Sequence, residues 1–337
     1  MDKVSSRILE MLRSNTGYIS GQQISTEFRI TRAAIWKHIR DLRKTGYIID
    51  AIPNKGYHLA SSPDILFEEE IHCLLSARTI GETVIFHREI DSTNSVAMLL
   101  ASDGAPHGTV VTSDSQTSGR GRRGREWFSP PGCNLYMSVI LRPSVSPAEA
   151  SQIPVISVLA VIRVLEHLNT GLPFQIKWPN DILCRGKKVC GILCEMKSDM
   201  DQVYHVVVGV GINVNVTSMD PCISDIATSL KLETNQDYSR IQLSASLLEE
   251  LEEIYLEWLQ ERNLKRYLEE WERYSLLIGR NVKIETPSET IAGIATGLSN
   301  NGSLILRLPS GAIREVYAGD AHIANHNSKP HMRGHAL

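Results

Sequence analysis

Between residues 83 and 235 this chain has more strand-like segments than helix-like ones, and this ratio constrains its fold more than any other feature. We expect strands over six ranges: 83–90, 108–114, 134–141, 174–178, 188–196 and 203–215. Apolar residues at helical spacing predict only two helices there, over 92–104 and 148–168. A doubly wound parallel sheet needs a helix between successive strands. Several of these strands are adjacent, so we predict an α+β fold rather than a doubly wound sheet.

The first 60 residues predict a separate module of three short helices and a hairpin. The third helix has Thr31 as its N-cap, Gly46 as its stop, and an apolar stripe of Ile35, Ile39 and Leu42. Its other face is basic, and two short strands follow around a turn with a basic tip. A basic second helix after a short turn, followed by a hairpin, is typical of a winged helix-turn-helix.

The charge of the chain is divided at the same place. Residues 1–60 hold ten Lys and Arg against five Asp and Glu, a balance of +5, whereas the remainder balances to −8. This asymmetry favours DNA binding by the N-terminal module, over the alternative of a small helical bundle with an ordinary solvated basic face. The residues expected to contact DNA are Gln22, Thr31, Arg32, Ala33, Trp36, Lys37, Arg40 and Lys55.

Composition changes mark the other domain boundaries. A Ser-Ser-Pro linker follows the hairpin, residues 240–275 predict a helical pair, and short strands with an Asn-Asn-Gly turn run from Arg280 to about Ile323. The expected domains are a winged helix-turn-helix (1–62), a catalytic domain (63–275), a small C-terminal β-barrel (276–325) and a disordered tail (326–337).

Targeting and membrane signals are not recognised in the sequence. The N-terminus does not read as a signal peptide, and we find no apolar run that reaches the roughly 20 residues needed to span a bilayer. We therefore expect a cytoplasmic protein with no membrane partner. The six cysteines fit a reducing compartment. Cys190 and Cys194 lie four apart on one expected strand, too far apart to share a zinc ion comfortably, so buried cysteines are the favoured interpretation.

An arginine-rich loop, Ser118–Glu126, is the strongest candidate for chemistry. Four arginines alternate with three glycines, and the aromatic pair Trp127-Phe128 follows. Glycines let the backbone approach a ligand closely, and arginines offer bidentate bonds to phosphate or carboxylate. The loop is bracketed by strands, which favours a mobile lid over a bound anion rather than a disordered nucleic-acid-binding tract.

Three further polar stretches are each ambiguous alone. Ser92 and Thr93 stand at a helix start, where they can bind a polar group or serve as a simple N-cap. The Lys177–Asp181 stretch combines a cation, an amide and a carboxylate, or is an ordinary turn at a strand end. Lys188 enters an apolar strand in which Gly191 permits close approach of a ligand or of another strand.

Together these stretches resemble the biotin protein ligase family, and specifically its two-function members that carry a winged helix and repress biotin genes. The order and spacing agree along nearly the whole chain, including the N-terminal module and the terminal strands. The residues that carry the resemblance are 91–94, 116–122, 127–129, 177–181, 188–193 and 209–213. The resemblance implies a central mixed-sheet ligase domain of the class II synthetase-like type and a C-terminal SH3-like β-barrel.

The resemblance also implies a reaction and its substrates. Such proteins activate the carboxylate of biotin with ATP, and they transfer the biotinoyl group from biotinoyl-AMP to a lysine of the biotin carboxyl carrier protein of acetyl-CoA carboxylase. Operator DNA, Mg²⁺ and a ligand-induced homodimer are further expectations. A lipoate-type ligase and a catalytically inactive, ligand-sensing transcription factor remain alternatives.

Site residues carry over by position. The implied catalytic residues are Lys188, Arg120 and Arg122. The implied biotin-binding residues are Ser92, Thr93, Asn94, Gln116, Gly119, Arg120, Gly121, Arg122, Lys188 and Gly191. The implied ATP-binding residues are Arg122, Arg123, Trp127, Lys177, Asn180, Asp181 and Asn213, with Asp181 as the residue for Mg²⁺.

Overall fold

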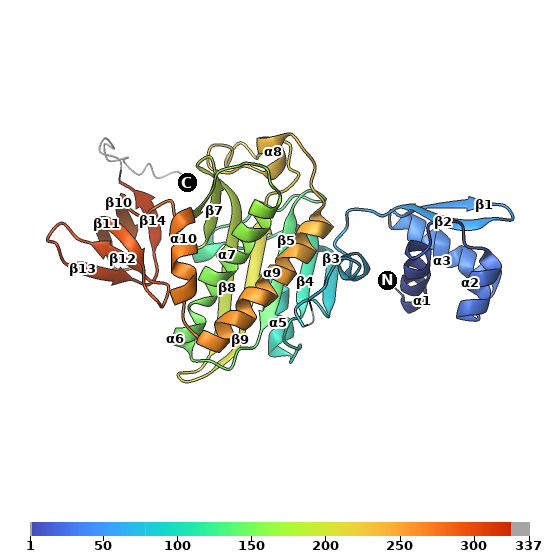
Figure 1. The fold of residues 1–337 in the computed structure, drawn as a ribbon, viewed down its shortest axis with the longest axis horizontal. Coiled ribbons are helices and arrows are strands. Elements are labelled where there is room, and N and C mark those ends of the chain that lie inside the picture. The colour runs from blue at the N-terminus through green and yellow to red at the C-terminus, as the bar shows by residue number, and fades with distance from the viewer. Residues whose placement is uncertain (1, 78, 325–337) are drawn as a thin grey trace. The chain divides into compact units, whose positions relative to one another are not determined.

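The computed structural model describes residues 2–77 and 79–324 (Figure 1). Its contacts divide the chain into two compact units, Met1–Ile65 and Leu66–Leu337, and each is described by itself. The tail expected to be disordered, residues 326–337, lies outside the described residues.

The N-terminal unit has the predicted three helices and hairpin. Its elements are α1 (Lys3–Arg13), α2 (Gly21–Phe28), α3 (Arg32–Lys44), β1 (Ile48–Ile52) and β2 (Gly56–Ser61). Ser20 forms a capping box with Gln23 at the start of α2, and Thr31 caps α3. The buried stripe of α3, Ile35, Ile39 and Leu42, packs into a core that belongs to this unit alone. The winged helix-turn-helix is therefore confirmed.

Seven strands of the second unit form one mixed sheet, in the order β3-β4-β5-β9-β8-β7-β6. The strands are β3 (Val84–Ile90), β4 (Val110–Gln116), β5 (Leu135–Leu141), β6 (Phe174–Lys177), β7 (Asp181–Cys184), β8 (Lys187–Ser198) and β9 (Val203–Ile212). Only β3 and β4 are parallel, and every other neighbouring pair is antiparallel. The predicted α+β class with a mixed sheet is confirmed.

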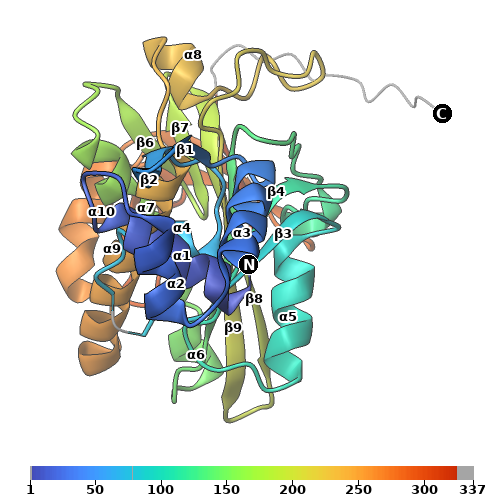
Figure 2. The same ribbon diagram turned by 90° about the vertical axis from the view of Figure 1, so that its right-hand side faces the viewer.

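Helices cover both faces of this sheet. They are α4 (Glu68–His72), α5 (Thr93–Ser102), α6 (Pro147–Ala150), α7 (Ile153–His167), α8 (Leu230–Thr234), α9 (Arg240–Glu261) and α10 (Leu268–Tyr274). Successive residues of a strand face opposite sides of a sheet. Accordingly Val208 joins the large core with α7 and α9, whereas Val207 packs with Ala97 of α5. Figure 2 shows α5 on one side of the strands and α9 and α10 on the other.

A C-terminal antiparallel sheet completes the second unit. Its strands are β10 (Asn281–Glu285), β11 (Thr290–Leu298), β12 (Leu304–Arg307), β13 (Ile313–Val316) and β14 (Asp320–Ile323), in the order β13-β12-β11-β10-β14. Gly302 takes a positive φ of 84° in the predicted turn between β11 and β12. The indole N–H of Trp178 donates to the carbonyl of Gly302 at 3.3 Å, and so fastens this sheet to the central one.

One sequence expectation about apolar runs is wrong. Pro147–His167, which contains α6 and α7, is 21 residues long and apolar enough, by length and composition, to cross a membrane. However, 72% of its apolar window is buried inside the protein, where α7 packs against α9 and β8. The segment is therefore the central core helix of the second unit.

Candidate active site

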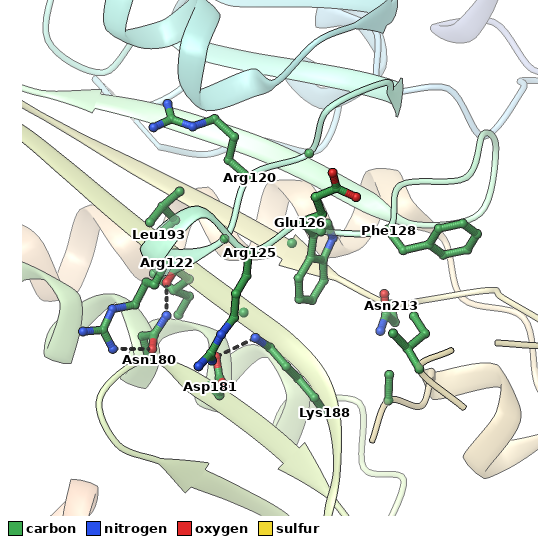
Figure 3. Close-up of a pocket in the computed structure, with 18 of the residues that line it drawn as sticks. Arg120, Arg122, Arg125, Glu126, Phe128, Asn180, Asp181, Lys188, Leu193 and Asn213 are labelled. Atoms are coloured by element: carbon green, nitrogen blue, oxygen red, sulfur yellow. Dashed lines mark hydrogen bonds and ion pairs between the residues drawn. The ribbon is translucent and has the colours of Figure 1, made fainter. Parts of the chain in front are cut away.

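A pocket of about 860 Å³ opens on the face of the central sheet that α5 covers (Figure 3). Part of its wall is glycine, because Gly191 of β8 lies opposite Gly211 of β9 and Gly209 is one step further along that face. We call these three residues the glycine floor. A Cβ at Gly211 would lie 2.6 Å from the ring of Trp127. The indole can therefore pack against the glycine floor only because Gly211 has no side chain.

The side of the pocket nearest α5 is held by Asn94. Its side-chain amide donates to Leu193 O at 3.1 Å and to Glu195 Oε2 at 3.0 Å, and its oxygen accepts from Ser138 Oγ at 2.7 Å. A Cβ at Gly209 would lie 1.8 Å from the Asn94 oxygen. Asn94 thus shapes the pocket wall through bonds it has already formed within the protein.

Gln116 fastens the start of the arginine loop to α5. Its oxygen accepts from the backbone N–H of Thr93 at 2.8 Å, and its amide donates to Ser129 Oγ at 2.8 Å. Gly119 passes close by, because a Cβ there would lie 2.3 Å from Trp127 O. The backbone of the loop and α5 are therefore joined at this end of the pocket.

Three arginines of the loop pair with carboxylates of β8 and β14. Arg120 pairs with Glu195 of β8 at 2.7 Å. Arg123 and Arg125 both pair with Asp320 of β14, the first at 3.3 Å. Asp320 is only 14% exposed, so the C-terminal sheet supplies a largely buried anion to this loop.

Arg122 lies deeper and bridges two domains. It donates to Asn180 Oδ1 at 3.2 Å, at the turn before β7, and to Gly319 O at 3.5 Å, beside β14. Burial is the main cause that lowers the pKa of its guanidinium, and the Asp320 carboxylate opposes that shift. A guanidinium stays protonated at neutral pH even so. A half-buried cation of this kind interacts strongly with an incoming anion.

Lys188 and Asp181 form the central ion pair of the pocket. Their Nζ and Oδ1 atoms are 2.7 Å apart, and the lysine ammonium lies 5.1 Å from the centre of the Trp127 ring. The backbone of Lys188 is fixed by bonds from its N–H to Ile226 O and from Thr228 N–H to its own carbonyl. The indole nitrogen of Trp127 is buried and finds no acceptor among the described residues.

The structure gathers almost all the sequence-predicted pocket residues. The residues of the predicted biotin and ATP sites that line the pocket are Ser92, Thr93, Asn94, Gln116, Gly119, Gly121, Arg120, Arg122, Trp127, Lys177, Asn180, Asp181, Lys188, Gly191 and Asn213. Arg123 does not line the pocket; it points to Asp320 and to the carbonyl of Glu285. Arg125, which sequence analysis left outside the site, does line it.

Two groups of pocket residues were missed in the sequence. The first is the segment from Asp220 to Ala227, and the second is Asp320 to His322 in β14. The first has no regular pattern of apolar residues. The second lies in an ordinary strand, and only the fold brings that strand to the arginine loop.

A magnesium ion can be tested against these residues. Within residues 2–77 and 79–324, no three Asp, Glu, His or Cys side chains come close enough together to hold a metal ion. Asp181 contributes one carboxylate, and Mg²⁺ is commonly held by one or two carboxylates together with substrate phosphates. The residues therefore fit Mg²⁺ only as a companion of a bound nucleotide.

The N-terminal unit carries its own candidate surface on α3. Trp36 is 55% exposed, and the Arg40 guanidinium lies 5.0 Å from its ring centre. Arg32 donates to the side-chain oxygen of Gln22 at 3.0 Å, which joins the starts of α2 and α3. Arg43 instead donates to Ile49 O, so it anchors the hairpin.

Comparison with known proteins agrees with this architecture. Residues 86–213 match the biotin/lipoate A/B protein ligase family, residues 5–58 match a helix-turn-helix domain, and residues 277–322 match the biotin protein ligase C-terminal domain. The fold and pocket are therefore those of a ligase of the biotin and lipoate class.

The similarity to individual relatives shows which branch of this class the chain belongs to. The bifunctional ligase/repressor BirA of Bacillus subtilis is 39% identical over 90% of this chain and 93% of its own, and the Escherichia coli BirA is 31% identical over 92% and 94%. The solved biotin protein ligase of Aquifex aeolicus, in complex with biotin and ATP, aligns with a TM-score of 0.62 at 33% identity over 72% of this chain and 99% of that one. This chain belongs to the biotin protein ligase family, among its members with an N-terminal helix-turn-helix.

Proposed function

We propose that this protein is an ATP-dependent biotin–[acetyl-CoA-carboxylase] ligase and a biotin-responsive transcriptional repressor. The observation that carries the proposal is that the match to bifunctional ligase/repressors extends over 90% of the chain, while the Lys188–Asp181 pair and the arginine loop meet in one pocket.

The first step joins two anions. A carboxylate oxygen of biotin attacks the α-phosphorus of ATP, the bond to the β-phosphate oxygen breaks, and pyrophosphate leaves. Negative charge grows on the α-phosphate oxygens, and preorganised cations stabilise it. We assign this role to Lys188 and Arg122, with Arg120 at the junction of carboxylate and phosphate. Arg123 and Arg125 hold the loop through Asp320.

The second step transfers the biotinoyl group to the carrier. The amine of a carrier lysine attacks the carbonyl carbon of the mixed anhydride, and AMP leaves with the electron pair of the broken C–O bond. The loop and Trp127 exclude water, which would otherwise hydrolyse this anhydride. The domain of a biotin carboxyl carrier protein is the partner we propose.

The binding roles follow the two sides of the pocket. Ser92, Thr93, Asn94, Gln116 and the backbone of Gly119 and Gly121 bind biotin on one side, and the amides of Asn94 and Gln116 also hold that side in shape through bonds within the protein. Lys177, Asn180, Asp181 and Trp127 line the ATP side, with Asn213 holding its wall. Mg²⁺ bound by the nucleotide phosphates and Asp181 would neutralise phosphate charge.

We infer that residues 1–62 bind operator DNA through α3 and the hairpin. Specific operators are usually bound as two half-sites by a symmetric dimer. A ligand-induced homodimer, with biotinoyl-AMP as the corepressor, is therefore part of the proposal. The domain limits 63–275 and 276–325, and a cytoplasmic location, are proposed with it. All six cysteines are free, which supports a reducing compartment.

An exchange assay tests the ligase proposal. Radiolabelled pyrophosphate should enter ATP when biotin is present and not when lipoate replaces it. Exchange with lipoate would favour the lipoate-type ligase, although no feature of the described pocket specifically indicates lipoate. No exchange with either acid would favour the inactive, ligand-sensing transcription factor.

A gel-shift titration at one fixed salt concentration tests the repressor proposal, because DNA affinity depends strongly on salt. Biotin plus ATP should tighten operator binding, since the adenylate favours the dimerising state. Arg122→Ala should reduce this effect without altering the DNA-binding unit. Equal affinity with and without ligands contradicts the corepressor model.

A further inference from the structure

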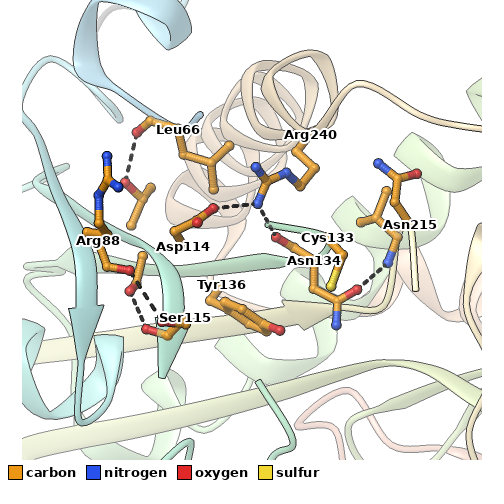
Figure 4. A network of polar contacts seen from close by, with 12 residues as sticks. Leu66, Arg88, Asp114, Ser115, Cys133, Asn134, Tyr136, Asn215 and Arg240 are labelled. Carbon is orange, nitrogen blue, oxygen red and sulfur yellow. Dashed lines mark hydrogen bonds and ion pairs between the residues drawn. The ribbon is translucent and has the colours of Figure 1, made fainter. Parts of the chain in front are cut away.

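A buried arginine, Arg240, stands at the start of α9 and does not line the pocket. Figure 4 shows it beside Asp114 and Asn134. Arg240 is 2% exposed and donates to Asp114 Oδ1 at 2.9 Å and to Asn134 O at 3.3 Å. Its position is unfavourable for a cation in two respects. Burial removes the charge from water, and the positive end of the helix dipole is close by. A buried apolar residue would avoid both costs. We therefore ask which groups the Arg240 side chain holds in position.

The partners of Arg240 lead directly to the pocket wall. Asn134 is 1% exposed; its side-chain oxygen accepts from Val214 N at 2.9 Å, and its amide donates to Asn213 Oδ1 at 3.3 Å. The Asn213 amide in turn donates to Thr228 O at 3.0 Å. A chain of polar contacts therefore runs from Arg240 of α9 to Asn134, which precedes β5. From Asn134 it continues to Asn213 and Thr228, which stand at the two ends of the segment between β9 and α8.

That segment forms part of the pocket wall. Its residues Asp220, Ile223 and Ile226 line the pocket, and Ile226 and Thr228 hold the backbone of Lys188 on either side. The side chain of Asn215 also forms two hydrogen bonds with the backbone of Tyr238. These bonds attach the same segment to the residues just before α9.

We propose that Arg240 is a positioning residue for the nucleotide side of the pocket, acting through Asn134 and Asn213. This inference rests on the proposed function, because it takes the wall near Lys188 and residues 220–227 as the side that receives ATP. Asn94, Gln116 and Ser138, which hold the biotin side, have bonds of their own to α5, β8 and the loop. Asp114, the other partner of Arg240, belongs to β4 but does not line the pocket, so the contacts of Arg240 that reach the pocket wall run through Asn134 to the nucleotide side.

The test compares Arg240→Met with Asn134→Ala in the full-length protein. Asn134→Ala removes the bonds to Asn213 and Val214 and leaves the Arg240–Asp114 pair in place, so it carries the test if Arg240→Met does not fold. Arg163→Met is the control: Arg163 makes a two-bond pair with Glu270 at 2.9 and 2.7 Å, and neither residue lines the pocket.

Affinities are measured by calorimetry with a non-hydrolysable ATP analogue and, separately, with biotin, and thermal unfolding is recorded for each variant. Both test variants should bind the analogue about tenfold more weakly, which corresponds to about 1.4 kcal/mol of binding free energy, and the KM for ATP should rise with it. Biotin affinity should stay within about twofold, and Arg163→Met should lower stability alone.

Two results would overturn the inference. One is unchanged affinity for the analogue in folded Asn134→Ala and Arg240→Met. The other is an equal loss for biotin and the analogue, which would indicate a purely structural role. If the wild-type protein binds the analogue but forms no adenylate, the proposed ligase function fails while the positioning test still stands.

Discussion

At the scale of single residues, Lys188 is held by three different kinds of contact. Asp181 pairs with its ammonium, Trp127 lies beside it, and the segment near Ile226 bonds its backbone. Each contact fixes where the positive charge stands before any substrate arrives. Such preorganisation distinguishes a transition-state cation from a flexible surface lysine.

We therefore expect Lys188→Ala to slow adenylate formation by about two to three orders of magnitude, the range seen when one preorganised donor is lost. Biotin binding should remain measurable by calorimetry. Lys197→Ala is a matched control, because Lys197 lies on the same strand β8, is exposed and does not line the pocket. Near wild-type turnover in folded Lys188→Ala would remove this residue from the mechanism.

Sequence alone identified most pocket residues but not their hydrogen-bonding state. Asn94 and Gln116 are expected to bind the ligand, and their side chains also hydrogen-bond to protein partners. A motif specifies that an amide is needed at a position. Whether that amide faces a ligand or a neighbouring strand depends on contacts between segments distant in sequence, which no local pattern reveals.

At the scale of elements, the alternation of small and large residues in β9 decides what the pocket admits. Gly209 faces an asparagine held by three bonds, whereas Gly211 faces the side chain of Trp127, which belongs to a loop. We expect Gly209→Ala to weaken biotin binding by about tenfold or more and to cost about 1–3 kcal/mol of stability, as overpacking does. Gly211→Ala should chiefly displace Trp127. Biotin titration and thermal unfolding measure both, and equal effects would contradict this distinction.

The arginine loop is attached to the C-terminal sheet through Asp320 of β14. Replacing Asp320 by Asn should release Arg123 and Arg125, and trypsin should then cut the ligand-free loop about fivefold faster. This factor corresponds to the loss of an ion pair worth about 1 kcal/mol, because cleavage follows the population of the open state. Glu289→Gln, which removes the Arg314 pair elsewhere in the same sheet, should leave the rate unchanged. An unchanged rate in Asp320→Asn would contradict the role of Asp320 as an anchor.

Most of the long elements were predictable from the sequence, and β7 is an exception. Apolar runs predicted the long strands β8 and β9, and capping residues predicted α3. The four-residue strand β7 was missed because Asp181–Cys184 has no period long enough to detect; it pairs only because the turn after Lys177 folds back. The helix α7 was predicted, but only its burial distinguishes its apolar run from a membrane span.

At the scale of the whole molecule, two cores are built from separate parts of the chain. Ten buried residues of the first unit pack together, and the central and C-terminal sheets share the other large core. Deleting residues 1–65 should therefore abolish operator binding while adenylate formation continues. Gel shift and pyrophosphate exchange measure the two activities on one preparation. Sequence-specific DNA binding by the truncated protein would contradict the assignment, and Arg40→Ala in the full chain serves as the point-variant control.

The cysteines differ in exposure, so a chosen one can be labelled chemically. Burial raises the pKa of the Cys184 thiol to about 11 and that of Cys194 to about 12, and raises that of Cys190 further still. The thiolate is the reactive form, so these three should resist alkylation at neutral pH. Cys73 and Cys222 are the exposed ones, and Cys222 lies at the pocket wall. A Cys73→Ser protein would therefore accept a maleimide dye at Cys222, where its emission could follow substrates entering and leaving in real time.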